Sequence, residues 1–249
     1  MPHAATPMPS APVVTVHLWG VPTRAIPGSL VRMATGRRKI RRIHGLRFAK
    51  LLGTGSGETF SVRDADFHHW GLIACWDDES DARVFELSSL VTTWDHHSFE
   101  KARFALAPVS SRGLWSGEDP FSPCVRHRSD GPVAAITRAR IPMRHWRRFA
   151  RAVPPVADAT SHAPGLIVRT GIGEAPVGLQ GTFSVWQDSS ALNAFTTGAA
   201  HQRVVDDTAR VGWYSEELFA RFGVTSATGT FCGTAVDAHT LPRIGDEHD

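Results

Sequence analysis

The chain has 249 residues, of which 42% are hydrophobic, so it can bury a large core as one domain or as two small domains packed together. A formal net charge of +3, from 27 Lys and Arg against 24 Asp and Glu, is too balanced to indicate a nucleic-acid partner. The 3 cysteines have no Cys-x-x-Cys spacing, so they predict neither a disulfide framework nor a structural zinc site. No apolar stretch approaches the roughly 20 residues of a membrane-spanning helix. We therefore expect a soluble, cytoplasmic globular protein.

The first half of the chain alternates strand and helix patterns. Residues 1–12 are rich in Pro, Ala and Ser and predict a flexible tail, and a period-two alternation from Val13 predicts a strand. A helix over 29–43, strands at 46–52 and 70–76, a helix capped by residues 77–80 and a strand at 102–109 follow. The basic run 37–42 favours a solvated helix face, with contact to an anionic membrane surface or to an acidic partner as the alternatives. Turn-rich residues 114–132 predict a linker.

The second half repeats this plan. Alternation from Val133 predicts a strand, and Trp146, Phe149 and Val153 lie on one side of an amphipathic helix. Strands at 166–170 and 181–186 and a helix from Ser189 come next. Short motifs recur in the same order in both halves: 55–58 with 171–174, 72–76 with 182–186, and 110–113 with 226–229.

Each half therefore has the order βαββαβ, which is that of a ferredoxin-like unit. We predict an α+β fold in which tandem ferredoxin-like repeats, residues 13–113 and 133–222, form an intramolecular dimeric α+β barrel. Residues 223–249 show no apolar period and are predicted to be a C-terminal tail.

A histidine in the second half marks a candidate cofactor site. Wound as a helix, residues 199–210 separate a charged outer face from an inner face of small residues that also carries His201. Small residues leave room for a flat group between helix and sheet, and a neutral imidazole can bind a haem iron axially. A core histidine bonded to a backbone carbonyl fits the same spacing. The pattern by itself leaves both interpretations open.

Other motifs predict less. The Gly-x-Gly-Glu turns at 55–58 and 171–174 lack the phosphate-loop spacing and favour tight strand turns. The adjacent pairs His68-His69 and His96-His97 are predicted to be surface residues. No serine-hydrolase or zinc-protease motif is present.

Several segments together resemble the spheroidene monooxygenase family. They are residues 50–58, 113–117 with Pro120-Phe121, 137–139, 171–174 with Pro176, 182–186 and 213–222, and the resemblance covers roughly residues 13–223. Members of that family are carotenoid-pathway oxygenases that look like haem proteins on a dimeric α+β barrel, related in fold to aldoxime dehydratases. The resemblance implies haem b, with His201 as the axial ligand because it precedes the 213–222 segment.

The resulting hypothesis is a haem-dependent monooxygenase that oxygenates a small or lipophilic biosynthetic intermediate and draws on an electron donor. His201 ligates the iron from the helix side, and substrate binds on the opposite side, against the strand 181–186. The predicted catalytic residues are Gln180, Ser184 and Arg169, and the predicted cofactor contacts are His201, Arg203, Arg210, Phe183 and Val205. Alternation puts Ser184 and Phe183 on opposite faces of their strand, with either face open to the haem.

Two alternatives remain from the sequence. One is a haem enzyme that acts on a nitrogen–oxygen bond, by aldoxime dehydration or nitrogen–nitrogen bond formation. The other is a non-catalytic haem-binding protein. The sequence predicts no oligomeric state.

Overall fold

The computed structural model describes residues 12–40, 43–58, 62–124, 131–142, 159–175, 181–198 and 214–237. The predicted N-terminal tail up to residue 11, the predicted helix at 146–153 and the stretch 199–210 lie outside these ranges. In chain order the elements are β1 (Val13–Gly20), α1 (Ile26–Ile40), β2 (Leu46–Gly55), β3 (Ala65–Trp76), α2 (Glu79–Glu86), α3 (Ser89–His96), β4 (Glu100–Gly113), β5 (Val133–Arg140), β6 (Leu166–Gly173), β7 (Gly181–Trp186), α5 (Ser189–Thr196), β8 (Glu216–Phe231) and β9 (Thr234–Ala235).

The helices α2, α3 and α5 begin where the sequence offers capping side chains. Asp78 accepts a hydrogen bond from the Ser80 amide at 2.7 Å and starts α2, as the polar run 77–80 predicts. Ser88 then caps a second helix, so the single helix predicted after residue 80 is two helices, α2 and α3. Asp188 caps α5 in the same way.

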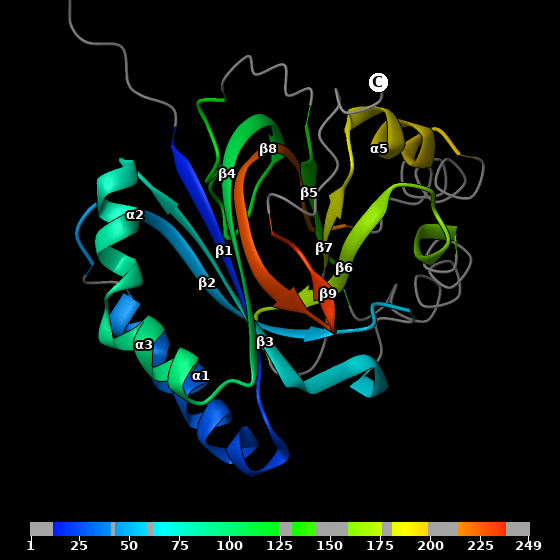
Figure 1. Ribbon diagram of the computed structural model, residues 1–249. Coiled ribbons are helices and arrows are strands. Elements are labelled where there is room, and N and C mark those ends of the chain that lie inside the picture. Colours follow the sequence, from blue (N-terminus) through cyan, green and yellow to red (C-terminus); the bar gives the residue numbers. More distant parts are fainter. Residues whose placement is uncertain are drawn as a thin grey trace, which may run out of the picture.

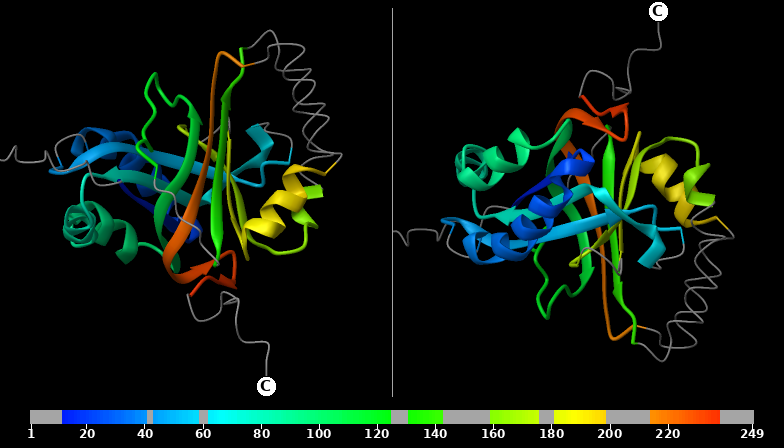
Figure 2. Two further views of the ribbon diagram at one scale, coloured as in Figure 1. Left: turned by 90° about the horizontal axis from the view of Figure 1, so that it is seen from above. Right: turned by 90° about the horizontal axis from the view of Figure 1, so that it is seen from below.

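The described strands form one antiparallel sheet in the order β4-β1-β3-β2-β6-β7-β5-β8-β9, and a further pairing of β4 with β8 closes it on itself (Figures 1 and 2). Closure matters because a strand paired on both sides has no exposed hydrogen-bonding edge. The predicted α+β class with an antiparallel sheet is confirmed.

The two halves use the same strand order. β1 pairs with β3 from Val13 opposite Trp76, and β5 pairs with β7 from Val133 opposite Trp186. The neighbouring strands β2 and β6 each have a register shift after their first residue pair. These shared registers give a position-by-position correspondence between the halves.

This correspondence corrects one predicted alignment. Counted from the start of each strand, Gly53 of β2 corresponds to Gly173 of β6, whereas the sequence motifs align Gly55 with Gly171. Gly53 lies opposite Gly173 where β2 and β6 pair, and Gly55 lies opposite Gly171. The motif alignment was wrong because glycine recurs at every second position at the end of β2, so Gly-x-Gly matches in more than one register.

The prediction of a tail from residue 223 is wrong for 223–231, which continue strand β8. This segment is rich in Gly, Ser, Thr and Ala and lacks an apolar period, but it pairs along β4 as far as Ala102. Within the predicted linker, Trp115 and Phe121 are buried in the core. The boundaries of the two repeats remain predictions.

Side chains fill the interior of the closed sheet. Leu18, Phe104, Ile136, Phe183 and Phe222 belong to one apolar cluster that draws on both halves. A second cluster lies outside the first half, between its strands and α1, α2 and α3, and a smaller one lies between β7 and α5 in the second half (Figure 1). No helix in the described ranges is long and apolar enough to cross a membrane.

Two glycines permit the pairing of β4 with β8. Gly229 has a φ of +93°, and an added Cβ would lie 2.0 Å from the Lys101 carbonyl oxygen. Gly113, at the corresponding place in β4, has a φ of +99°, and an added Cβ would lie 2.1 Å from the Glu217 carbonyl oxygen. Both positions therefore exclude any side chain.

We predict that Gly229→Ala lowers the free energy of unfolding by about 2 kcal/mol or more, since it adds a backbone clash to the strain of a positive φ. Gly117→Ala is the matched control, because Gly117 has a φ of +84° with nothing within 4 Å of an added Cβ. Its expected loss is about 1 kcal/mol. Urea denaturation followed by circular dichroism measures the free energy of unfolding of both variants. Equal losses would show that the pairing of β4 with β8 accommodates a side chain at residue 229 without a clash.

Candidate functional site

The outer face of the second half carries Ser184 and Arg169, two of the three predicted site residues that the structure describes. Ser184 of β7 lies opposite Arg169 of β6 and opposite Ala135 of β5. Residues directly opposite in antiparallel strands share a face of the sheet. Trp186, two residues beyond Ser184, packs against Phe195 of α5. These side chains therefore face outward, toward the helix side of the sheet.

Ser184 and Phe183 lie on opposite faces, as alternation predicts. Ser184 is buried, and its Oγ accepts a hydrogen bond from Trp186 Nε1 at 2.9 Å. The ring of Phe183 packs edge-on against Phe104 inside the closed sheet, with centroids 5.5 Å apart. The tertiary structure thus decides what the sequence left open: Ser184 belongs to the outer face and Phe183 to the interior.

Arg169 reaches from β6 toward the first half. Its Nη2 donates to the Gly57 carbonyl oxygen at 3.0 Å, and its Nη1 donates to Ser161 Oγ at 3.1 Å. Partial burial lowers the pKa of Arg169, while the nearby carboxylates of Glu58 and Asp64 oppose this. An arginine remains protonated under such conditions. Arg169 therefore brings a fixed positive charge to the edge of the outer face.

Five predicted site residues lie outside the described ranges. They are Gln180, His201, Arg203, Val205 and Arg210. Their roles stay predictions. A surface cavity of about 520 Å³ lies in the first half, lined by residues 22, 24–25 and 96–99, and includes none of the predicted site residues.

In the first half, aromatic rings fill the equivalent outer face. Trp19 of β1 stacks on Trp94 of α3 with centroids 5.2 Å apart, and Trp70 lies 6.0 Å from the same ring. His17 is fully buried between Trp19 and Phe85. Large side chains therefore occupy the whole space between strands and helices here.

In the second half, small side chains take those places. The shared registers put Thr137 where the first half has His17, and Thr182 where it has Leu72. Thr137 is exposed, and Thr182 and Ala135 are only partly buried. The described residues therefore leave this outer face open, whereas the first half closes the same face with rings.

A partly buried charge cluster around the buried Arg138 joins segments of both halves. Glu174 Oε1 accepts hydrogen bonds from Trp115 Nε1 at 2.9 Å and from Arg138 Nη2 at 3.1 Å, and its Oε2 accepts one from Lys50 Nζ at 3.2 Å. Arg138 also pairs with Glu216. Burial alone would raise the pKa of Glu174, but the Trp115 hydrogen bond and the charge of Lys50 hold it below its usual value. The cluster is thus a set of ionised, mutually satisfied groups.

None of these five residues has a role predicted from the sequence, although each lies in a segment that carries the resemblance. A signal was present. Arg138 shares its strand face with Ala134 and Ile136, which point into the core, and a buried arginine requires carboxylate partners. The partners could not be named from the sequence because they come from distant positions, Glu174 and Glu216.

Comparisons with known proteins connect the chain to characterised relatives. It is 34% identical over 215 residues to a spheroidene monooxygenase of Rhodobacter capsulatus, covering 85% of this chain and 89% of that protein. It is 38% identical over 192 residues to a spheroidene monooxygenase of Rubrivivax gelatinosus, covering 76% and 73% of the two chains. No protein-family profile matches.

Solved structures show the same fold. An aldoxime dehydratase aligns with a TM-score of 0.55 at 10% identity, covering 86% of this chain and 82% of that chain. An aldoxime dehydratase in complex with butyraldoxime gives a TM-score of 0.55 at 13% identity, covering 86% and 80%. The sequence relatives indicate an oxidoreductase, and the chain belongs to the spheroidene monooxygenase family.

Proposed function

We propose that this chain is a haem-dependent monooxygenase that oxygenates a small or lipophilic biosynthetic intermediate, with haem b held by His201 against the outer face of β5, β6 and β7. The open face of the second half is the observation that carries the proposal. Family membership supports oxygenase chemistry, and the relatives are named for spheroidene. We also propose that the halves are tandem ferredoxin-like repeats, 13–113 and 133–222, in an intramolecular dimeric α+β barrel; their shared strand order supports this.

Among the described residues, those on the outer face of the second half fit a flat cofactor, and those on the outer face of the first half do not. In the first half, a planar group would collide with the rings of His17 and Trp19. In the second half, Thr137 and Ala139 stand at the positions of these two rings, and the neighbouring Ala135 and Ser184 are also small. A haem bound there supplies an iron centre able to activate O₂. In this proposal Val205 packs on the macrocycle, and Arg203 and Arg210 pair with its propionates.

The residues of the sheet then orient substrate and protons. Trp186 Nε1 occupies one lone pair of Ser184 Oγ, which fixes the hydroxyl and directs its hydrogen away from the indole. Ser184, with Gln180 beside the strand, donates hydrogen bonds on the substrate side. Arg169, held by Gly57 and Ser161, supplies positive charge at the edge of this surface. Phe183, predicted from the sequence to contact the cofactor, lies in the interior, and in this proposal it supports the strand instead.

A second candidate function acts on a nitrogen–oxygen bond. The shared fold with aldoxime dehydratases, at a TM-score of 0.55, favours keeping it. In this case haem would supply a site for the substrate nitrogen, and Ser184 or Arg169 would assist the departure of water by donating a hydrogen bond to the leaving oxygen. No external electron donor is then consumed, whereas the monooxygenase requires one.

The proposed enzyme works in the cytoplasm, where its thiols stay reduced. Cys75, Cys124 and Cys232 are unpaired. A lipophilic substrate also suits peripheral contact with a membrane surface, for which the basic last turn of α1, with Arg37, Arg38 and Lys39, is the candidate.

We predict that the purified protein, reconstituted with haem if necessary, has a Soret band that His201→Ala abolishes or shifts. His97→Ala is the control, because His97 is exposed and its ring bonds to the Thr93 carbonyl oxygen in the first half. Absorption spectroscopy with a haem assay measures both variants. A wild-type protein that takes up no haem contradicts the cofactor proposal, and an unchanged spectrum in His201→Ala contradicts the ligand.

Turnover separates the two functions. Spheroidene with a chemical reductant and O₂ should give an oxygenated product by mass spectrometry if the first proposal holds. Conversion of an alkyl aldoxime to a nitrile without O₂ would instead support the second. Haem binding with neither product would leave a haem-binding protein without catalysis.

We predict that Thr137→Trp reduces haem uptake at least tenfold while the protein stays folded, because an indole would fill the open outer face as Trp19 does in the first half. Ser226→Trp is the control, because Ser226 is an exposed residue of β8 away from that face. Haem content per folded protein is measured beside far-ultraviolet circular dichroism. Full haem uptake by Thr137→Trp would place the cofactor elsewhere.

A further inference from the structure

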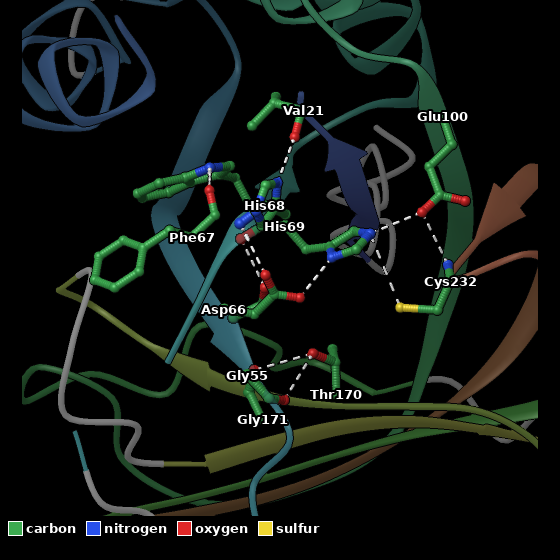
Figure 3. A network of polar contacts seen from close by, with 12 residues as sticks. Val21, Gly55, Asp66, Phe67, His68, His69, Glu100, Thr170, Gly171 and Cys232 are labelled. Carbon is green, nitrogen blue, oxygen red and sulfur yellow. Dashed lines mark hydrogen bonds and ion pairs between the residues drawn. The ribbon is translucent and has the colours of Figure 1, made fainter. Parts of the chain in front are cut away.

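A cluster of ligand-type side chains lies at the turn between β8 and β9, in the region that the sequence predicts to be tail. His69 of β3, Glu100 of β4 and Cys232 of the turn converge there (Figure 3). His69 Nε2 lies 2.7 Å from Glu100 Oε1 and 3.9 Å from Cys232 Sγ. The three potential ligand atoms all lie within 4.8 Å of one another.

The histidine ring is held by a second carboxylate. Asp66 Oδ2 lies 2.6 Å from His69 Nδ1, on the side of the ring away from the cluster (Figure 3). This contact directs Nε2 toward Glu100 and Cys232. Carboxylates commonly orient metal-binding histidines in this way, by fixing the ring and its tautomer.

The turn itself is shaped around Glu100. The amide of Cys232 donates to Glu100 Oε1 at 3.0 Å, and the amide of Gly233 donates to Oε2 at 3.2 Å. Cys232 has a φ of +49°, which is uncommon for a residue other than glycine. The rings of Phe99 and Phe231 pack edge-on against His69. Backbone amides of the turn and neighbouring aromatic rings therefore hold the cluster in place.

We propose that His69, Glu100 and Cys232 bind a divalent transition metal, zinc above all, with water as the fourth ligand. Imidazole nitrogen, carboxylate oxygen and thiolate sulfur are the ligands that zinc accepts in tetrahedral sites. Zinc bonds of about 2.0–2.3 Å place ligand atoms roughly 3.3–3.7 Å apart, so the carboxylate moves outward by less than about 1 Å. The metal displaces the protons of Nε2 and Sγ, which pass to solvent.

The site is separate from the proposed haem surface. It joins β3 and β4 of the first half to the β8–β9 turn, whereas the proposed haem surface lies on β5, β6 and β7. A bound metal would cross-link the end of β8 to the first half. The proposal does not rest on haem binding.

The test uses the full-length protein, reduced, treated with a chelator and then dialysed. Titration with Zn²⁺ should load one equivalent at the site, and titration with Co²⁺ should give a thiolate-to-metal charge-transfer band in a difference spectrum. Cys232→Ser and His69→Gln should each lose that equivalent, and Cys232→Ser should lose the band. Asp66→Asn should weaken binding about 10- to 100-fold, as expected for a residue that orients a ligand.

Matched variants separate this site from other histidines and thiols. His68→Gln removes the neighbouring ring, which bonds to the Val21 carbonyl oxygen, and Cys124→Ser removes a thiol that lies near Phe121. Both should bind metal as the wild type does. His201→Ala should also keep the equivalent, which distinguishes failure of this proposal from failure of the haem proposal.

Thermal unfolding provides a second readout. Zn²⁺ should raise the Tm of the wild type but not that of Cys232→Ser or Glu100→Gln, since a ligand stabilises the state that binds it. If Cys232→Ser does not fold, Glu100→Gln and His69→Gln carry the same comparison. Failure of the wild type to bind Zn²⁺ or Co²⁺, or equal binding by the wild type and all three ligand variants, would overturn the proposal.

Discussion

The pairing of β4 with β8 is the constraint on which the rest of the structure depends. These are the last strands of the two halves, and their pairing converts two sheets into one closed sheet with a shared interior. The close approach requires glycine at two corresponding places, Gly113 and Gly229, where a side chain would meet a carbonyl of the opposing strand. Without this pairing, both strands would present open hydrogen-bonding edges, and the interior apolar cluster would be exposed between β4 and β8.

Closure gives each half one interior face and one outer face, and the outer faces have diverged. In the first half, tryptophan rings pack between strands and helices, so this side contributes apolar burial. In the second half, Thr137 stands at the position of His17 and Ala139 at that of Trp19. The two halves thus differ in side-chain size on the same face: rings pack the first, whereas the described residues leave the second open.

Polar clusters connect parts of the chain that are far apart in sequence. Glu174 gathers Lys50, Trp115 and Arg138, and Glu100 holds the β8–β9 turn beside His69. Charges removed from water are tolerated only when partners are supplied in good geometry, so each cluster depends on the correct pairing of several strands. Both clusters therefore depend on the closed arrangement of the sheet.

The sequence by itself determined the order of the strands β1 to β8 and the alternation of their faces. The strand at 181–186 and the opposite orientations of Phe183 and Ser184 follow from a period-two pattern, which is local. Only the tertiary structure decided which face is interior, the register of Gly53 against Gly173, and the extension of β8 to Phe231, because each depends on a pairing partner. The cluster of His69, Glu100 and Cys232 was hidden for the same reason: its ends are 163 residues apart, and closure of the sheet brings them together.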